Sequence, residues 1–318
     1  MSDPWFAASN VLVVAGKGGV GKTTVGASVA IAAARARLDV LVVELEGHSS
    51  LTTLFELGAE PAGRGTTAGS GTGLGYDEIE LRLDRLELPG RIRARHVRPD
   101  DALADYLDRA GLGPLTRRLT RSGAIEVVAT AAPGIRDLLA LGKIRQIEQA
   151  GEADLIVVDA PATGHALTFL TAPAGLADAS TTGPVRDQAD RVLEMFADDR
   201  RCQVALVTLP EETPVSETVE AAFALEDDVG LKLAPVVING VWPEVPGLVE
   251  AASGRTGSRE AKRAARYRLG RQADQRSEIE RLATELPLPQ VELPYVFTTG
   301  LGVDDLSILA DALTGGRR

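Results

Sequence analysis

Short apolar runs alternate along the chain with longer segments whose apolar residues recur at helical spacing. The apolar runs predict buried strands at Val11–Ala15, Val40–Glu44, Leu155–Asp159, Val204–Thr208, Pro235–Asn239 and Val291–Leu293. The Ala-rich segment Gly21–Arg37 predicts a helix after the first of them. This alternation is typical of an α/β fold, in which a doubly wound, mostly parallel sheet has helices on both faces. We expect one such domain over residues 1–318.

A helical insertion interrupts the alternation. Leucine and isoleucine recur at helical spacing between Asp100 and Gln149, and a short amphipathic segment follows. Residues of about 100–150 and 174–200 therefore predict a helical insertion subdomain. Its apolar stripes either form a groove for a client or pack on their own core, and the second reading is favoured because such stripes are usually core. Residues 61–75, rich in Gly and Thr, predict a flexible loop.

The net charge and the hydropathy of the chain limit the kinds of partner and the location that we expect. The net charge of −11 disfavours nonspecific binding to DNA, so no nucleic-acid partner is expected. Gly254–Arg281 has a helical pattern and many arginines. These favour a solvated helix face, with a site for an acidic partner as the alternative. No apolar run is long enough to span a bilayer and no signal peptide is recognisable, so we expect a cytoplasmic protein, with peripheral membrane contact left open.

The first strand runs directly into a glycine-rich loop. The phosphate-loop pattern G-x-x-x-x-G-K-[ST] is met by Gly16, Gly21, Lys22 and Thr23. Glycines let the backbone curl tightly and turn its N–H groups towards phosphate oxygens. Lys22 is expected to reach the β- and γ-phosphates, and the Thr23 hydroxyl to bind Mg²⁺. The candidate nucleotide loop comprises Gly16, Lys17, Gly18, Gly19, Val20, Gly21, Lys22, Thr23 and Thr24.

The extra lysine, Lys17, makes the loop resemble the deviant Walker A loop of dimeric P-loop ATPases. That class includes septum-site, plasmid-partition, nitrogenase-iron-protein, arsenite-pump and tail-anchored-protein-targeting members. The resemblance implies a P-loop NTPase core, ATP and Mg²⁺ as ligands, and a sandwich dimer. It also implies that Lys17 reaches the partner's nucleotide as a charge-neutralising finger, analogous to an arginine finger.

The strand that ends at Asp159 carries the second motif. A carboxylate at the carboxyl end of a parallel strand suits a Walker B Mg²⁺ ligand. The sequence that follows resembles switch II of the arsenite-pump and tail-anchored-targeting branch, typically D-T-A-P-T-G-H-T-L-R-F-L. The residues that match are Pro161, Thr163, Gly164 and His165. Taken by its position alone, His165 is equally well explained as a satisfied loop histidine.

The segment Val42–Phe55 resembles switch I, typically D-P-A-H-N-L-S-D-A-F. Aligning Leu51 and Phe55 places Glu46 on the family's aspartate, so the resemblance implies that Glu46 orients the attacking water. Glutamate is one methylene longer. This departure affects turnover more than binding, because positioning errors are costly in catalysis. The resemblance thus implies catalytic roles for Lys17, Lys22 and Glu46.

Two further segments match the places where the family contacts adenine. Asn239 ends a strand where the family uses an asparagine amide, although asparagine at a strand end is more often a turn former. Pro294, Tyr295 and Val296 fall where a loop packs on the base. The resemblance spans about residues 10 to 313, and 57–98 and 242–285 align poorly.

Cysteine and methionine usage separates the chain from well-known branches. Its one cysteine, Cys202, supplies neither a thiolate site for arsenite nor a Cys₄ zinc site in a two-fold dimer. With two methionines in all, the chain lacks a methionine-rich groove for a transmembrane client. The motifs are most similar to those of paired bacterial anion-transporting ATPases of high-GC Gram-positive bacteria, a resemblance carried by Val43–Gly47, Ala132–Asp137, Asp159–His165 and Glu292–Pro294. That resemblance implies either a homodimer or a heterodimer with a paralogous ATPase.

These observations favour a dimeric Mg²⁺-dependent ATPase whose nucleotide-driven opening and closing moves a helical platform. The platform is a candidate site for a protein client or a membrane-protein partner. Two alternatives stay open. One is a low-turnover ATP-binding regulatory subunit beside a paralogue, favoured by Glu46. The other is a small-molecule phosphotransferase on the same fold, ranked last because it has no need of Lys17.

Overall fold

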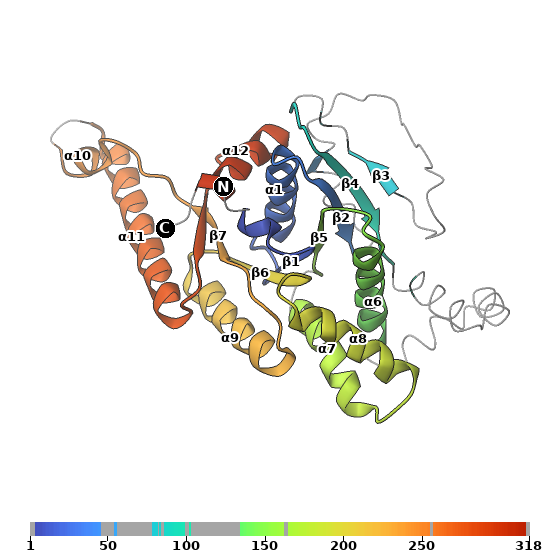
Figure 1. Cartoon of the computed structure of the whole chain (residues 1–318). Helices are drawn as coiled ribbons and strands as arrows, with labels where there is room; N and C mark the ends of the chain where they lie inside the picture. Colours follow the sequence, from blue (N-terminus) through green and yellow to red (C-terminus); the bar gives the residue numbers. More distant parts are fainter. Residues whose placement is uncertain are drawn as a thin grey trace, which may run out of the picture.

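The computed structural model describes residues 4–45, 54–55, 78–81, 83, 86–98, 102, 134–161, 165–254 and 257–315. Figure 1 shows the arrangement of these residues. The strands are β1 (Val11–Ala15), β2 (Asp39–Glu44), β3 (Glu78–Glu80), β4 (Arg91–His96), β5 (Leu155–Asp159), β6 (Cys202–Thr208), β7 (Val236–Val241) and β8 (Gln290–Pro294). The helices are the 3₁₀ turn η1 (Trp5–Ala7), α1 (Lys22–Arg35), α6 (Ile135–Ala150), α7 (His165–Ala179), α8 (Pro184–Ala197), α9 (Glu212–Val229), α10 (Leu248–Ser253), α11 (Arg259–Glu285) and α12 (Val303–Gly315).

One sheet organises the molecule, in the order β3-β4-β2-β5-β1-β6-β7-β8. All neighbouring strands from β4 to β8 pair in parallel, and only the short β3 is antiparallel, on β4. β1 lies in the interior of the sheet between β5 and β6. The predicted α/β class with a doubly wound, mostly parallel sheet is therefore confirmed.

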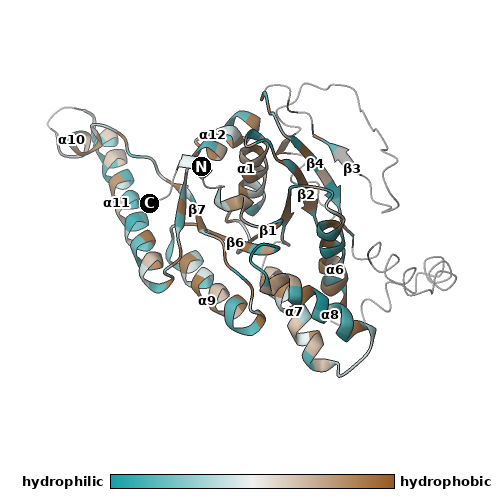
Figure 2. Ribbon diagram, viewed as in Figure 1, coloured by the Kyte–Doolittle hydropathy of each residue, from teal (hydrophilic) through white to brown (hydrophobic). Residues whose placement is uncertain are grey.

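Alternation along the buried strands divides the core into two layers. Val11 and Val13 of β1 face one cluster, and Leu12 and Val14 face the other. The first cluster includes α6, α7, α8 and α9, and the second includes α1 and α12. Figure 2 shows the central strands as hydrophobic ribbons between these layers. Because both faces are covered, the strands read as continuous apolar runs.

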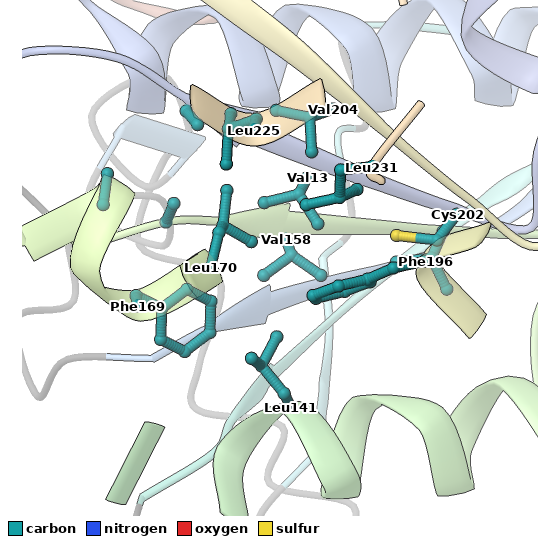
Figure 3. Packing of buried hydrophobic residues seen from close by; sticks show 14 of the residues in the cluster. Val13, Leu141, Val158, Phe169, Leu170, Phe196, Cys202, Val204, Leu225 and Leu231 are labelled. Carbon is teal, nitrogen blue, oxygen red and sulfur yellow. The ribbon is translucent and has the colours of Figure 1, made fainter. Parts of the chain in front are cut away.

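Helices α6, α7 and α8 form a compact unit on one face of the sheet. They pack against one another, and α7 also packs on α9. Figure 3 shows the contact with the central strands through Val13, Val158, Leu141, Phe169, Leu170 and Phe196. The apolar stripe of α6 is therefore core, as the sequence favoured for it. Residues 103–133 of the expected insertion and the expected loop 61–75 lie outside the described residues.

The remaining boundaries bear on the site. The amphipathic segment near residue 190 forms α8, and the helix of the arginine-rich segment Gly254–Arg281 is α11, with α10 directly before it. Strand β7 extends two residues beyond the predicted end at Asn239, with a register shift between Ile238 and Val241. Gly240, in that irregular stretch, has a φ of 74°. None of the helices in the described part of the chain is both long enough and apolar enough to cross a bilayer.

Candidate functional site

The loop between β1 and α1 has a backbone that requires glycine at particular positions. Gly19 and Gly21 have φ values of 84° and 92°, in the left-handed region that side chains with a Cβ disfavour. A Cβ on Gly16 would lie 2.3 Å from the carbonyl oxygen of Val207 on β6. A Cβ on Gly21 would lie 2.2 Å from Nδ2 of Asn239. The loop is thus held closely against the ends of β6 and β7.

Helix α1 begins at Lys22, so the N–H groups of its first turn point into the loop. Lys22 is buried, and its Nζ donates to the backbone carbonyl of Lys17 at 3.1 Å. The ammonium group therefore lies across the loop, beside the positive end of the helix dipole. Lysine, dipole and loop amides together form an anion site.

A hydroxyl and a carboxylate meet at the carboxyl ends of two adjacent strands. The Thr23 hydroxyl, in the first turn of α1, donates to Oδ2 of Asp159 at 2.8 Å. Asp159 is the last residue of β5 and is in register with Val14 of β1. The structure thus brings together two oxygen groups that the sequence analysis singled out 136 residues apart.

The second loop lysine has a partner within its own chain. Lys17 Nζ forms an ion pair with Oε1 of Glu217 on α9. Both side chains are partly exposed, at 47% and 40%. Glu217 was not among the predicted site residues. An ion pair across 200 residues has no signal in local sequence patterning.

Asn239 lies against the phosphate loop. Its Nδ2 donates to the carbonyl of Val20 at 2.9 Å, and it lies where the register of β7 shifts between Ile238 and Val241. On the neighbouring strand, Pro294 ends β8, and Tyr295 N donates to the carbonyl of Val241 at 2.8 Å. Asn239, which contacts the loop, and the segment Pro294–Val296 therefore lie at the carboxyl ends of adjacent strands.

Comparison with known proteins agrees with this geometry. A family model described as anion-transporting ATPase matches residues 9–181. ATPase BagA of Mycobacterium tuberculosis is 31% identical over 330 residues, covering 95% of this chain and 91% of that protein. The chain belongs to the anion-transporting ATPase family. ATPase GET3B of Arabidopsis thaliana is 26% identical, and the alignment covers 73% of this chain and 64% of that protein. The arsenical pump-driving ATPase of Acidiphilium multivorum is 26% identical, and the alignment covers 81% of this chain and 44% of that protein.

Sequence reasoning missed a second carboxylate at this edge of the ATPase. Glu44, the last residue of β2, is in register with Asp159 on β5 and with His96 on β4. Its Oε2 lies 3.1 Å from Nε2 of His96, and the carboxylate is buried. Registered residues of parallel strands point to the same face. Glu44, Asp159 and His96 therefore form a row along the carboxyl edge.

Several predicted site residues of the ATPase lie in or next to segments outside the described residues. Glu46, Thr163 and Gly164 lie outside the described residues. His165 is placed by its backbone as the first residue of α7. Pro161 lies two residues beyond β5 and is half-buried. The roles of these residues remain predictions.

The single cysteine of the ATPase is part of the core. Cys202 is fully buried at the start of β6. Burial raises the pKa of its thiol to about 12, because the apolar surroundings disfavour the thiolate. Metal and metalloid ligation needs the thiolate, so this environment is unsuited to it.

Proposed function

We propose that the chain is a dimeric, Mg²⁺-dependent ATPase that converts ATP hydrolysis into movement of its helices. The observation that carries this proposal is the contact between Thr23 and Asp159 beside Lys22. A hydroxyl and a carboxylate next to an anion-binding loop are what a metal–nucleotide complex requires. Family membership supports the hydrolytic activity.

Lys22 and the loop amides hold the β- and γ-phosphates, because the lysine already lies over the loop. Asn239 binds the adenine edge, and Pro294, Tyr295 and Val296 pack on the base. Support for this assignment comes from their position at the carboxyl ends of β7 and β8 and from the contact of Asn239 with the phosphate loop.

The oxygen groups of Thr23 and Asp159 fit Mg²⁺, which prefers hard oxygen ligands and keeps several waters. Asp159 would hold the ion through one of those waters. When bound, Mg²⁺ neutralises charge on the β- and γ-phosphate oxygens. Glu46, from the segment after β2, orients the attacking water.

Lys17 completes the site of a second subunit. In the single chain its ammonium is paired with Glu217 on α9. A partly exposed ion pair exchanges partners at little cost. On dimerisation Lys17 leaves Glu217 and reaches the partner's nucleotide, where it stabilises charge on the leaving oxygens.

Hydrolysis is coupled to the helices through α7. This helix begins six residues after Asp159, and it packs on α6, α8 and α9. Loss of the γ-phosphate releases the segment between Asp159 and α7, and the unit of α6, α7 and α8 shifts with it. A protein client or membrane-protein partner bound to this unit would be released or moved.

Charge removal at the metal site tests the proposal. Asp159→Asn is expected to abolish Mg²⁺-stimulated phosphate release while ATP binding in excess EDTA is kept. Asp154→Asn, just before the start of the same strand, is the matched control, because an amide oxygen still accepts the bond from Asp39 N. Full phosphate release by Asp159→Asn, or by Lys22→Ala, would overturn the proposal.

One alternative has a specific observation in its favour. The cis pairing of Lys17 with Glu217 also suits a subunit that binds ATP with little turnover until a paralogous ATPase displaces the pair. Mixing with the paralogue would then raise turnover of a chain that is inactive alone.

A further inference from the structure

A second candidate site lies on α10 and α11, which we call the arm. Figure 1 shows the arm at one end of the molecule, with α10 at its outer tip. The first half of α11, Arg259–Arg271, carries six cationic side chains and one carboxylate, a net charge of +5. The whole chain has a net charge of −11, so the rest of the protein carries −16. This basic segment is thus an isolated positive region on an acidic protein.

The basic groups of this segment share a face. Arg259, Lys262, Arg263 and Arg266 are spaced at i, i+3, i+4 and i+7, which places them on one side of a helix. None of the four forms an ion pair with any carboxylate in the described part of the chain. Figure 2 shows hydrophilic residues along α11, in contrast to the central strands. A helix face with four uncompensated cations favours an anionic partner.

Aromatic rings lie next to this basic face. Trp242, Tyr267, Tyr295 and Phe297 form a cluster in which neighbouring ring centroids are 4.7 to 6.3 Å apart. Tyr267 follows Arg263 by one helical turn and is 64% exposed, and Phe297 is 61% exposed. Large exposed aromatic rings that lie together are typical of binding surfaces.

The ring cluster is held in place before any partner binds. The Arg268 guanidinium lies 5.2 Å from the ring centre of Trp242 and 5.1 Å from that of Phe297. Arg268 also donates to the carbonyl of Pro243 at 2.9 Å, and Trp242 N donates to Gln275 at 2.9 Å. Preorganised rings lose little conformational entropy on binding, which favours affinity.

We propose that the arm binds an acidic segment of a partner protein. The segment places carboxylates against Arg259, Lys262, Arg263 and Arg266, and one large apolar side chain on the rings of Tyr267 and Phe297. Carboxylates fit the guanidinium groups in bidentate geometry. A long polyanion such as nucleic acid fits less well, since it would extend over the acidic remainder of the surface. The basic face of this site lies outside the nucleotide site and the unit of α6, α7 and α8, and its ring cluster borders the proposed adenine site at Tyr295.

The test uses the full chain and a fluorescent helical peptide of about 20 residues, with glutamate on one face and leucine and phenylalanine on the other. We expect micromolar binding by anisotropy, weakened as ionic strength rises. The peptide with lysine in place of glutamate is expected not to bind. Trp242 emission is expected to change on binding, since Trp242 belongs to the ring cluster.

Paired variants locate the binding. The double variant Arg259→Glu and Arg263→Glu is expected to weaken peptide binding at least about tenfold, with ATP turnover unchanged. Arg200→Glu, at an exposed arginine outside the arm, is the charge control. Phe297→Ala is expected to weaken binding as well, whereas Phe223→Ala, at a 49% exposed ring on α9, is not.

Three outcomes would overturn the proposal. The first is peptide binding that is absent or is unchanged in the double variant. The second is tighter binding of a single-stranded oligonucleotide of equal charge. The third is loss of a dimer in the double variant, measured by light scattering, together with no peptide binding by the wild-type protein. That result would identify the occupant of the site as a second copy of this chain.

Discussion

Lys17 of the phosphate loop is ion-paired with Glu217 on α9 of the same chain. The pair joins the phosphate loop to a helix that packs on α7. Both side chains are partly exposed, so the pair contributes only about 0–1 kcal/mol to folding. A contact this weak is suited to exchange, in which Lys17 moves from its own Glu217 to a second subunit.

Glu217→Gln is expected to release Lys17 without destabilising the fold. The amide keeps the shape of the side chain but loses the charge that holds the ammonium. ATP-dependent dimerisation should therefore occur at lower protein concentration, measured by light scattering over a dilution series. The midpoint of thermal unfolding should change little. Glu220→Gln, one turn further along α9, is the control, and weaker dimerisation of Glu217→Gln would contradict the exchange.

Gly21→Ala is expected to act through Asn239. A Cβ at this position would lie 2.2 Å from Asn239 Nδ2, so the amide must turn away from the Val20 carbonyl. ATP affinity should fall about tenfold or more, and the preference for ATP over GTP should fall with it. Isothermal titration with both nucleotides measures these changes.

Gly19→Ala separates this clash from backbone strain. Its φ of 84° is similar to that of Gly21, but within the described part of the chain no atom beyond the two adjacent residues lies within 4 Å of the added Cβ. The Gly19→Ala variant should therefore keep the preference for ATP over GTP. The double variant of Gly21→Ala with Asn239→Ala should lose no more of that preference than Asn239→Ala alone. Gly21→Ala acts by displacing the amide that Asn239→Ala removes, so the two effects should not add. Additive losses would show that Gly21 acts independently of Asn239.

Cys202 is expected to resist alkylation in the folded protein. With a thiol pKa of about 12, only about one molecule in 10⁴ is a thiolate at pH 8. The folded-state pKa is raised above the unfolded value, so this thiol's contribution to stability is complete below about pH 9 and is lost as the pH rises towards 12. Labelling should be slow until urea unfolds the chain, and Cys202→Ala should flatten the loss of stability above pH 9. Rapid labelling of the native protein would contradict a buried thiol.

Local patterns of apolar residues were enough to predict most of the fold. The strand before Gly16 and the strand that ends at Asp159 are visible as apolar runs, and α/β alternation orders them in one sheet. Both layers of helices cover these strands, so burial and sequence pattern agree. The alternation of polar and apolar residues in Ile79–Leu86 and Arg91–Val97 is typical of a hairpin, and β3 and β4 do pair antiparallel at the sheet edge.

Contacts between distant segments could not be predicted in the same way. The pairing of Lys17 with Glu217 depends on how α9 packs, and the ring cluster combines Trp242, Tyr267 and Phe297 from three segments. The amide of Asn239 reaches the phosphate loop across 219 residues of sequence. Each of these depends on tertiary geometry that no local pattern encodes.

The most direct test of the dimeric ATPase is to measure phosphate release and molar mass on the same purified sample, with and without MgATP. We expect MgATP to double the mass and to support turnover. Lys17→Ala should lose both and still bind ATP, while Lys232→Ala, at an exposed lysine outside the site, should lose neither. Turnover by a stable monomer, or wild-type turnover in Lys17→Ala, would contradict the action of Lys17 across a dimer.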